Sequence, residues 1–220
     1  MTEKRSAAVR MSRAVLWGLT AGVVLTACGG GEEAQSPRVT AAQQCDQTLS
    51  PGAAKALEAL LGTEKFDAAP VGALDRAVGQ LTEDYAQGKR RSTHPPMCRP
   101  SPADASVQLD IAFGLYDEDD LFGDAPPVGL HPYDMGREAQ SGSDRAYVFV
   151  ECVSPRLKGS ERRPARIRGT LRFPKSGLPD TVATREANLT VLHSVTLALV
   201  KRLGCAGNAG LAETPVLKAE

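Results

Sequence analysis

The stretches YVFVECV (residues 147–153) and ARIRGTLRF (residues 165–173) decide the fold. The first is a nearly continuous run of apolar β-formers, which is typical of a central strand. The second alternates, so one of its faces must be buried and the other wet. The predicted inward residues are Ile167, Leu171 and Phe173, with Gly169 between them, and the outward ones are Arg166, Arg168, Thr170 and Arg172. Because only the short segment Pro155–Pro164 connects the stretches, we expect an antiparallel hairpin.

Other periodic segments surround this hairpin. A period of two over residues 107–115 predicts a further half-buried strand. Helical spacing predicts helices over residues 51–62, 71–87 and 184–203, with Ser50 and Thr184 as candidate N-caps. The sequence therefore predicts an α+β fold, in which an antiparallel sheet of three or more strands is covered by about three helices.

The first 28 residues have the pattern of a bacterial lipoprotein signal peptide. Four basic residues precede an apolar run of 13 residues, Ala14–Thr26, which is short of the roughly 20 needed to span a bilayer. The sequence Leu25-Thr26-Ala27-Cys28 resembles a lipoprotein cleavage site, which implies cleavage before Cys28 and diacylglyceryl attachment to it. Two acyl chains are enough for stable anchoring. We expect a protein held by lipid at the extracytoplasmic face of the cell membrane.

Charge argues against two classes of partner. Removing residues 1–27, with four basic residues and one acidic residue, leaves 22 Lys and Arg against 25 Asp and Glu. Such a balance is not that of a nucleic-acid binder, and it does not favour electrostatic adhesion to anionic lipid. The lipid is thus the expected membrane contact.

We predict a flexible tether over residues 28–44, a single α+β domain over 45–206 and a flexible tail over 207–220.

Four cysteines follow Cys28, and an even number in an exported chain predicts disulfides. They are Cys45, Cys98, Cys152 and Cys205. Three pairings are open. We predict Cys45 with Cys98, which would tie the start of the helical region to its exit. The other pair, Cys152 with Cys205, would pin the central strand to the end of the last helix. The absence of a C-x-x-C motif argues against a thioredoxin-like or paired-cysteine zinc site.

Two charged clusters invite a binding interpretation. The acidic run Asp117–Asp120 does not fit a calcium-binding EF-hand loop, because Leu121 and Phe122 occupy the positions of a ligand and a glycine. We predict a solvated loop there and no metal site. Basic residues around the hairpin predict either contact with lipid headgroups or an anionic envelope polymer, or a solvated face that protects an edge strand. These are Arg156, Lys158, Arg162, Arg163, Arg166, Arg168 and Arg172.

No local catalytic signature is present. His94, His131 and His193 are scattered, and the sequence lacks G-x-S-x-G, H-E-x-x-H, P-loop and dinucleotide-binding motifs. A serine, histidine and aspartate from distant positions could still assemble into a triad, since triads are defined by geometry. We predict no catalytic residues and no cofactor.

The stretch from Asp117 to Ser143 is unusually long for a loop between two strands. It contains aromatic and apolar residues that a fully solvated loop would not need. We expect it to pack back on the domain. Tyr133, Asp134 and Met135 are the candidate residues for a ligand or partner surface.

Taken together, these features resemble the actinobacterial envelope lipoproteins of unknown function. The matching pieces are the lipoprotein signal, the helical region from Cys45 to Gly62, the strand ending at Cys152 and the helix ending at Leu203-Gly204-Cys205. The resemblance implies a helix-covered antiparallel sheet and an extracytoplasmic location, and it brings no catalytic residues.

Three classes of function fit this sequence. We expect a non-enzymatic binding or accessory module, because an anchor, a spacer and a long apolar-containing loop occur without a catalytic motif. Its partner would be another envelope protein. The alternatives are a cell-envelope hydrolase and a purely structural envelope component.

Overall fold

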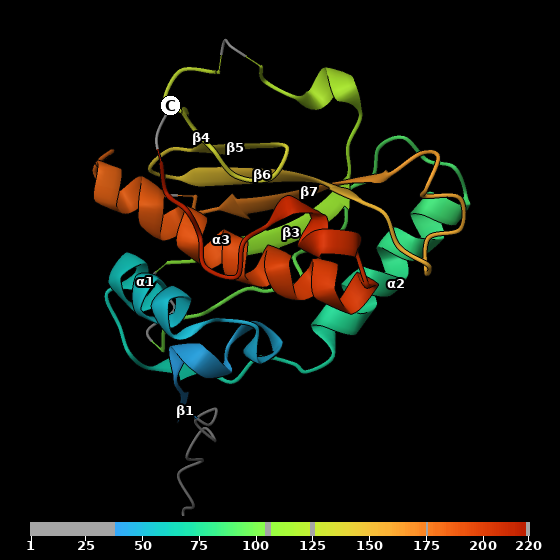
Figure 1. Ribbon diagram of the computed structural model, residues 1–220. Coiled ribbons are helices and arrows are strands. Elements are labelled where there is room, and N and C mark those ends of the chain that lie inside the picture. The colour runs from blue at the N-terminus through green and yellow to red at the C-terminus, as the bar shows by residue number, and fades with distance from the viewer. Residues whose placement is uncertain (1–37, 104–106, 124–125, 175, 219–220) are drawn as a thin grey trace, which may run out of the picture. The chain divides into compact units, whose positions relative to one another are not determined.

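A computed structural model describes residues 38–103, 107–123, 126–174 and 176–218 (Figure 1). The predicted signal peptide, Cys28 and residues 29–37 lie outside the described residues. No helix in the described part of the chain combines the length and the apolar character needed to cross a membrane.

The centre of the fold is a five-stranded antiparallel sheet in the order β3-β7-β6-β5-β4. Its strands are β3 (Asp110–Leu115), β4 (His131–Tyr133), β5 (Glu138–Ser141), β6 (Arg145–Cys152) and β7 (Ala165–Arg172). The hairpin predicted from the sequence is formed by β6 and β7, and its register runs from Arg145 opposite Arg172 to Cys152 opposite Ala165. A separate two-stranded sheet joins β1 (Arg38–Val39) to β2 (Phe66–Asp67).

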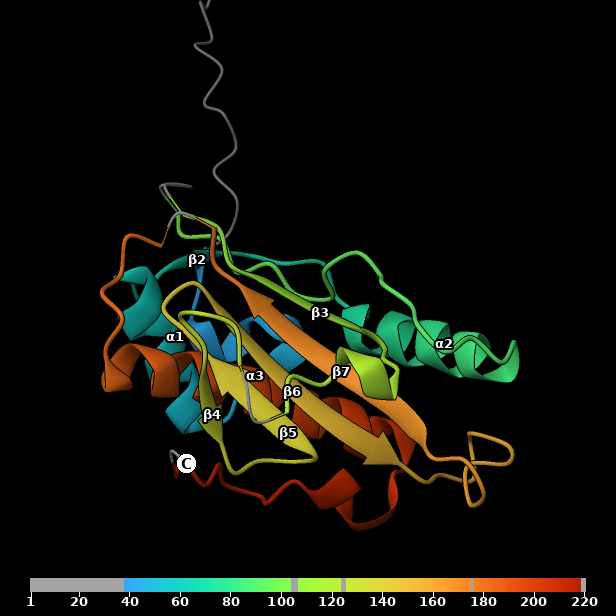
Figure 2. The same ribbon diagram turned by 90° about the horizontal axis from the view of Figure 1, so that it is seen from above.

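Three helices lie on one side of the large sheet, as Figures 1 and 2 show. They are α1 (Pro51–Leu61), α2 (Ala73–Ala86) and α3 (Val182–Leu203). The longest, α3, packs across β5, β6 and β7; α1 packs on α3, and α2 contacts both α3 and β3. The predicted α+β fold, an antiparallel sheet covered by about three helices, is confirmed.

Capping residues set the helix boundaries. Ser50 begins α1, where its hydroxyl accepts a hydrogen bond from the Ala53 N–H at 3.2 Å. The predicted N-cap of the last helix was wrong by three residues. Thr181 is the cap, because its hydroxyl accepts from the Thr184 N–H at 3.2 Å and the first turn therefore starts earlier. Gly204 ends α3 in the left-handed conformation, with a φ of 73°.

The two faces of β7 differ as predicted. Ile167, Leu171 and Phe173 are almost completely buried, whereas Arg172 is exposed. Gly169 lies where α3 approaches most closely, since a Cβ built there would be 2.9 Å from the Thr196 hydroxyl and 3.0 Å from the Phe113 ring. A glycine in the middle of a strand is typical of such a close approach.

The long stretch from Asp117 to Ser143 is not a single loop. It contains a 3-10 helix (Glu118–Asp120) and the strands β4 and β5. The sequence does not reveal β5 because Glu138–Ser141 has neither alternation nor β-branched residues. The stretch does pack back on the domain: Phe122 contacts Tyr147 and Phe149 edge-on, with ring centroids 5.4 Å and 5.8 Å away. The segment after β3, with its 3-10 helix, runs on the side of the sheet opposite α3 (Figure 1).

The ordered region extends past both predicted domain boundaries. Before Cys45, β1 pairs with β2, and Ala41 and Gln44 are fully buried. At the other end, a 3-10 helix (Ala206–Gly210) precedes the buried Leu211. The Lys218 carbonyl accepts a hydrogen bond of 3.1 Å from the Asp134 N–H, next to the edge strand β4. Both segments were predicted as flexible. Neither segment has the apolar periodicity of a helix or a strand, so the sequence did not indicate these contacts.

Both disulfides have the predicted pairing, Cys45–Cys98 and Cys152–Cys205. The first links a short 3-10 helix (Cys45–Gln47) to a segment that bridges to β3 at Ile111. The second links the end of β6 to the residue after Gly204.

Candidate functional site

The three residues predicted as a partner surface lie mostly in the core. Tyr133 is 3% exposed and Met135 is 7% exposed, and both belong to the main hydrophobic cluster. Only Asp134 is exposed. Because Tyr133 is the last residue of β4, alternation turns its ring inward. These apolar and aromatic side chains therefore serve packing, and a partner could reach only Asp134.

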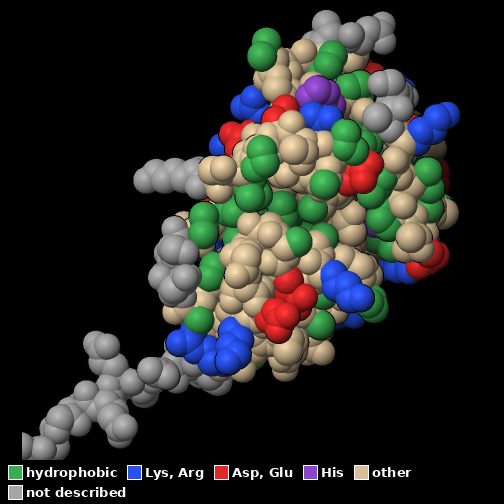
Figure 3. Space-filling view, turned by 90° about the vertical axis from the view of Figure 1, so that its left-hand side faces the viewer, with side chains coloured by type: hydrophobic (Ala, Val, Ile, Leu, Met, Phe, Trp, Pro, Cys, Tyr) green, Lys and Arg blue, Asp and Glu red, His purple; other side chains and the backbone are tan. Residues whose placement is uncertain are grey.

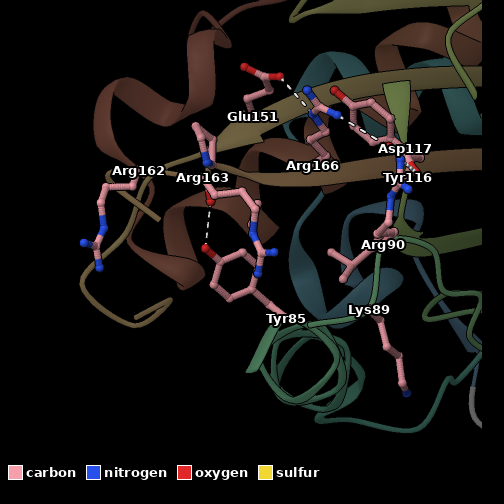
Figure 4. Close-up of a pocket in the computed structure, with 12 residues that line it drawn as sticks. Tyr85, Lys89, Arg90, Tyr116, Asp117, Glu151, Arg162, Arg163 and Arg166 are labelled. Atoms are coloured by element: carbon pink, nitrogen blue, oxygen red, sulfur yellow. Dashed lines mark hydrogen bonds and ion pairs between the residues drawn. The ribbon is translucent and has the colours of Figure 1, made fainter. Parts of the chain in front are cut away.

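A cleft of about 470 Å³ opens elsewhere, between the C-terminal part of α2, the end of β3 and the β6–β7 connection (Figure 4). Five cationic residues and two carboxylates line it. The cations are Lys89, Arg90, Arg162, Arg163 and Arg166, and the anions are Asp117 and Glu151. Such an excess of positive charge stands out on a protein with 26 basic and 26 acidic residues. On the face shown in Figure 3, by contrast, side chains of both signs are interspersed.

Strand ends bring these residues together. Tyr116 and Asp117 follow β3, Glu151 is near the end of β6, and Arg166 is at the start of the antiparallel β7. Since β7 lies between β3 and β6, the three strand ends meet on one edge of the cleft. Arg166 points outward because of the alternation of β7.

Arg166 is the centre of an ion-pair network. Its guanidinium lies 3.6 Å from Asp117, 2.7 Å from Glu118 and 3.4 Å from Glu151. Figure 4 shows it held between Asp117 on one side and Glu151 on the other. A guanidinium fixed in this way loses little further side-chain entropy when it binds a ligand.

Asp117 is 5% exposed and pairs with Arg90 as well as Arg166. The hydrogen bond from Arg90 holds the pKa of Asp117 below its usual value, although burial opposes this. Asp117 therefore stays ionised and is neutralised by its own partners. The prediction of a solvated acidic loop was wrong for this residue. Asp117 is buried because the acidic run and the basic residues of the hairpin, which are distant in the sequence, fold against each other.

Tyr85 and Arg163 form the opposite wall. The Tyr85 hydroxyl donates to the Arg163 carbonyl at 2.7 Å, and the Arg163 guanidinium lies over the Tyr85 ring at 5.6 Å from its centroid. In Figure 4 this guanidinium faces the cleft, while the Arg162 side chain extends away. No ion pair of Arg163 occurs among the described residues. Its charge is therefore available to an anion.

Tyr116 lies at the back of the cleft and is 1% exposed. Its ring packs edge-on against Phe149 with centroids 5.0 Å apart, and its hydroxyl has no hydrogen-bond partner in the described part of the protein. Burial raises the pKa of Tyr116 well above its usual value, and Glu151 adds to the effect. The hydroxyl therefore remains a protonated donor. An unsatisfied buried hydroxyl costs free energy, which a ligand atom can recover.

The histidines do not form a catalytic relay. The buried Asp84 carboxylate binds His94 at 2.6 Å and Lys89 at 2.6 Å, and it also accepts from Ser92. In a serine hydrolase triad the histidine lies between the serine and the acid. Here the acid, Asp84, lies between Ser92 and His94. This cluster fixes the segment after α2. His193 bonds to the Ala212 carbonyl at 3.0 Å, and burial lowers its pKa.

Within residues 38–103, 107–123, 126–174 and 176–218, no group of three or more His, Cys, Asp or Glu side chains is placed to hold a metal ion. Sequence reasoning singled out Arg162, Arg163 and Arg166 as part of a basic patch but missed Tyr85, Arg90 and Tyr116. The run Lys89-Arg90-Arg91 was the only signal on that side.

No protein-family model matches this chain, no curated protein matches it, and no solved structure matches it.

Proposed function

We propose that this protein is a lipid-anchored, non-enzymatic binding module at the extracytoplasmic face of the membrane. Its recognition site is the cationic cleft, and its ligand carries negative charge. The observation that carries this proposal is that Arg163 presents its guanidinium to the cleft without an ion pair among the described residues, while Asp117 and Glu151 are paired with Arg90 and Arg166.

The anchor has separate support. Four of the five cysteines form disulfides, which persist in oxidising extracytoplasmic compartments. The fifth, Cys28, directly follows the Leu25-Thr26-Ala27 sequence. We infer that Cys28 carries the lipid, as in the envelope lipoproteins that the sequence resembles. A tethered cleft would act at a high effective concentration toward ligands in the same envelope.

Binding without turnover agrees with the chemistry of the cleft. Among the described residues that line it are tyrosine, lysine, arginine, carboxylate and apolar side chains, and no serine, cysteine or histidine. Guanidinium groups bind anions strongly and with defined geometry. Turnover in an esterase, peptidase or glycosidase screen would contradict the proposal.

Mass spectrometry of the membrane fraction tests the anchor. We expect a mature chain that starts at lipid-modified Cys28 and that stays with the membrane in high salt. The Cys28→Ser variant should be unmodified and lose this salt-resistant attachment. An unmodified Cys28 in the wild type would refute the anchor.

A panel of carboxylate, sulfate and phosphate compounds tests the cleft. The measurement is the thermal stability of the full protein at constant ionic strength, because a ligand that binds only the folded state raises the unfolding temperature. At least one anion should stabilise the wild type and stabilise Arg163→Gln less. If no anion does so, the cleft is not a binding site.

A further inference from the structure

Several hydrogen-bond donors in the cleft are not fully used. Arg166 uses its guanidinium on three carboxylates, yet a guanidinium has five N–H groups. Arg163 has its guanidinium over a ring, without an ion pair among the described residues. The Tyr116 hydroxyl is buried and unsatisfied, and it points toward the side of the cleft where Arg166 and Glu151 lie (Figure 4).

The two carboxylates that line the cleft are paired with arginine. Asp117 is bound by Arg90 and Arg166, and Glu151 is bound by Arg166. A group that complements the free Arg163 charge and the Tyr116 hydroxyl offers acceptor oxygens and negative charge. A phosphoryl group presents more terminal oxygens than a carboxylate, and planar guanidinium donors suit it well.

The size and walls of the cleft indicate an ester rather than a free ion. Its volume of about 470 Å³ lies in the range of about 300–1,000 Å³ typical of small-molecule sites, which is far larger than one phosphate group needs. Leu115, Pro164 and the Tyr85 ring supply apolar wall beside the donors. This wall can contact the carbon atoms of the alcohol part.

We propose that the cleft binds the phosphoryl group of a phosphate ester, with Arg163 and Arg166 as charged donors and Tyr116 as a neutral donor. This rests on the proposed function and specifies its ligand. The ester can be a soluble molecule or a lipid headgroup, since both present the same oxygens.

Calorimetric titration of the detergent-solubilised full protein with glycerol 1-phosphate tests the proposal, with acetate as the carboxylate comparison. We expect glycerol 1-phosphate to bind at least about tenfold more tightly than acetate, and inorganic phosphate to bind more weakly than the ester. Micelles doped with phosphatidylglycerol identify the source: competition with glycerol 1-phosphate indicates a headgroup, and no competition indicates a soluble ester.

Variants place the binding in the cleft. Arg163→Gln removes an exposed charge while the Tyr85 bond to the backbone carbonyl remains, and it should weaken binding of glycerol 1-phosphate about tenfold or more. Arg172→Gln is the matched control, because it makes the same change at another exposed arginine that lies outside the cleft, and the affinity of this variant should stay within about twofold of the wild type.

Tyr116→Phe keeps the ring packed on Phe149 and removes only the unsatisfied hydroxyl, so binding should weaken several-fold while the unfolding temperature of the free protein does not fall. Equal losses in Arg163→Gln and Arg172→Gln, or equal affinity for acetate and glycerol 1-phosphate, would overturn the phosphoryl assignment. In the second case binding of anions would survive, so the proposed function would stand while this inference fell. Absence of all anion binding would remove both.

Discussion

At Gly114 a single missing Cβ lets two chain segments touch. A Cβ there would lie 2.1 Å from the backbone carbonyl oxygen of Ser92. The same contact includes hydrogen bonds of 3.0 Å from the Ser92 N–H to the Leu115 carbonyl and from the Leu115 N–H to the Ser92 hydroxyl. The segment around Ser92, which follows the cleft residues Lys89 and Arg90, is therefore fixed to β3 at Gly114.

We predict that Gly114→Ala lowers the free energy of unfolding by about 1–3 kcal/mol, since the clash is with backbone. Gly79→Ala is the control, because nothing lies within 4 Å of its Cβ position in the interior of α2, and it should stabilise by up to about 1 kcal/mol. Urea denaturation measures both. A Gly114→Ala variant as stable as the wild type would show that the segment can move away freely.

Asp84 holds the residues that follow α2. Burial raises its pKa, but hydrogen bonds from Lys89, Ser92 and His94 outweigh this, and the net pKa is below the ordinary 3.8. A group with a lowered pKa in the folded state contributes stability above its unfolded value, and this contribution is lost as the pH falls through the folded value. The contribution of Asp84 is therefore complete above pH 3.8 and disappears below it.

Asp84→Asn should cost about 1–3 kcal/mol of unfolding free energy at neutral pH, because the buried amide cannot replace the charged acceptor. Its deficit relative to the wild type should shrink below pH 3.8. Asp119→Asn, whose side chain is 83% exposed, is the matched control and should change stability by less than about 0.5 kcal/mol. A deficit that is independent of pH would rule out the ionised form of Asp84 as the source.

Among the elements, the stretch between β3 and β4 depends on one aromatic anchor. Phe122 contacts Tyr147 and Phe149, and its N–H and that of Gly123 donate to the Glu138 carboxylate at 3.0 Å and 3.2 Å. Removing the ring takes away this apolar contact and leaves hydrogen bonds and ion pairs to hold the stretch.

We predict that Phe122→Ala costs about 2 kcal/mol and increases hydrogen exchange at Phe122 and Gly123, while amides of β6 and β7 keep their order of protection. Val128→Ala in the same stretch should do neither, because Val128 is 96% exposed. Equal exchange in both variants would mean that the ring does not anchor this element.

For the whole molecule, the two disulfides hold distant parts of one core together. Each spans a sequence separation of 53 residues, for which the chain-entropy model gives about 4 kcal/mol. Typical domains have a net stability of only about 5–15 kcal/mol.

Loss of either pair by double Cys→Ala substitution should therefore lower stability by about 2–4 kcal/mol, and loss of both should leave a barely folded domain. Denaturation with and without reductant measures this. The variant without Cys45, Cys98, Cys152 and Cys205 should not respond to reductant. Unchanged stability in the reduced wild type would contradict the prediction.

Elements with local signals could be predicted from the amino-acid sequence. Alternation predicted β7, a continuous apolar run predicted β6, and helical spacing predicted α1 and α3, although the N-cap was correct only for α1. The disulfide pairing followed from where the cysteines stand relative to these elements. Each of these features depends on neighbours within a few residues or on chain order, which the sequence contains directly.

The cationic cleft, in contrast, is formed by tertiary contacts that the sequence does not show. The contacts of Asp117 with Arg90 and Arg166, and of Tyr85 with Arg163, join residues that are far apart in the chain. No periodicity encodes them, because they depend on which strand ends meet and on how α2 packs beside β3. For the same reason the sequence could not show that Tyr133 faces the core: its orientation follows from the pairing of β4 with β5, which non-local hydrogen bonds create.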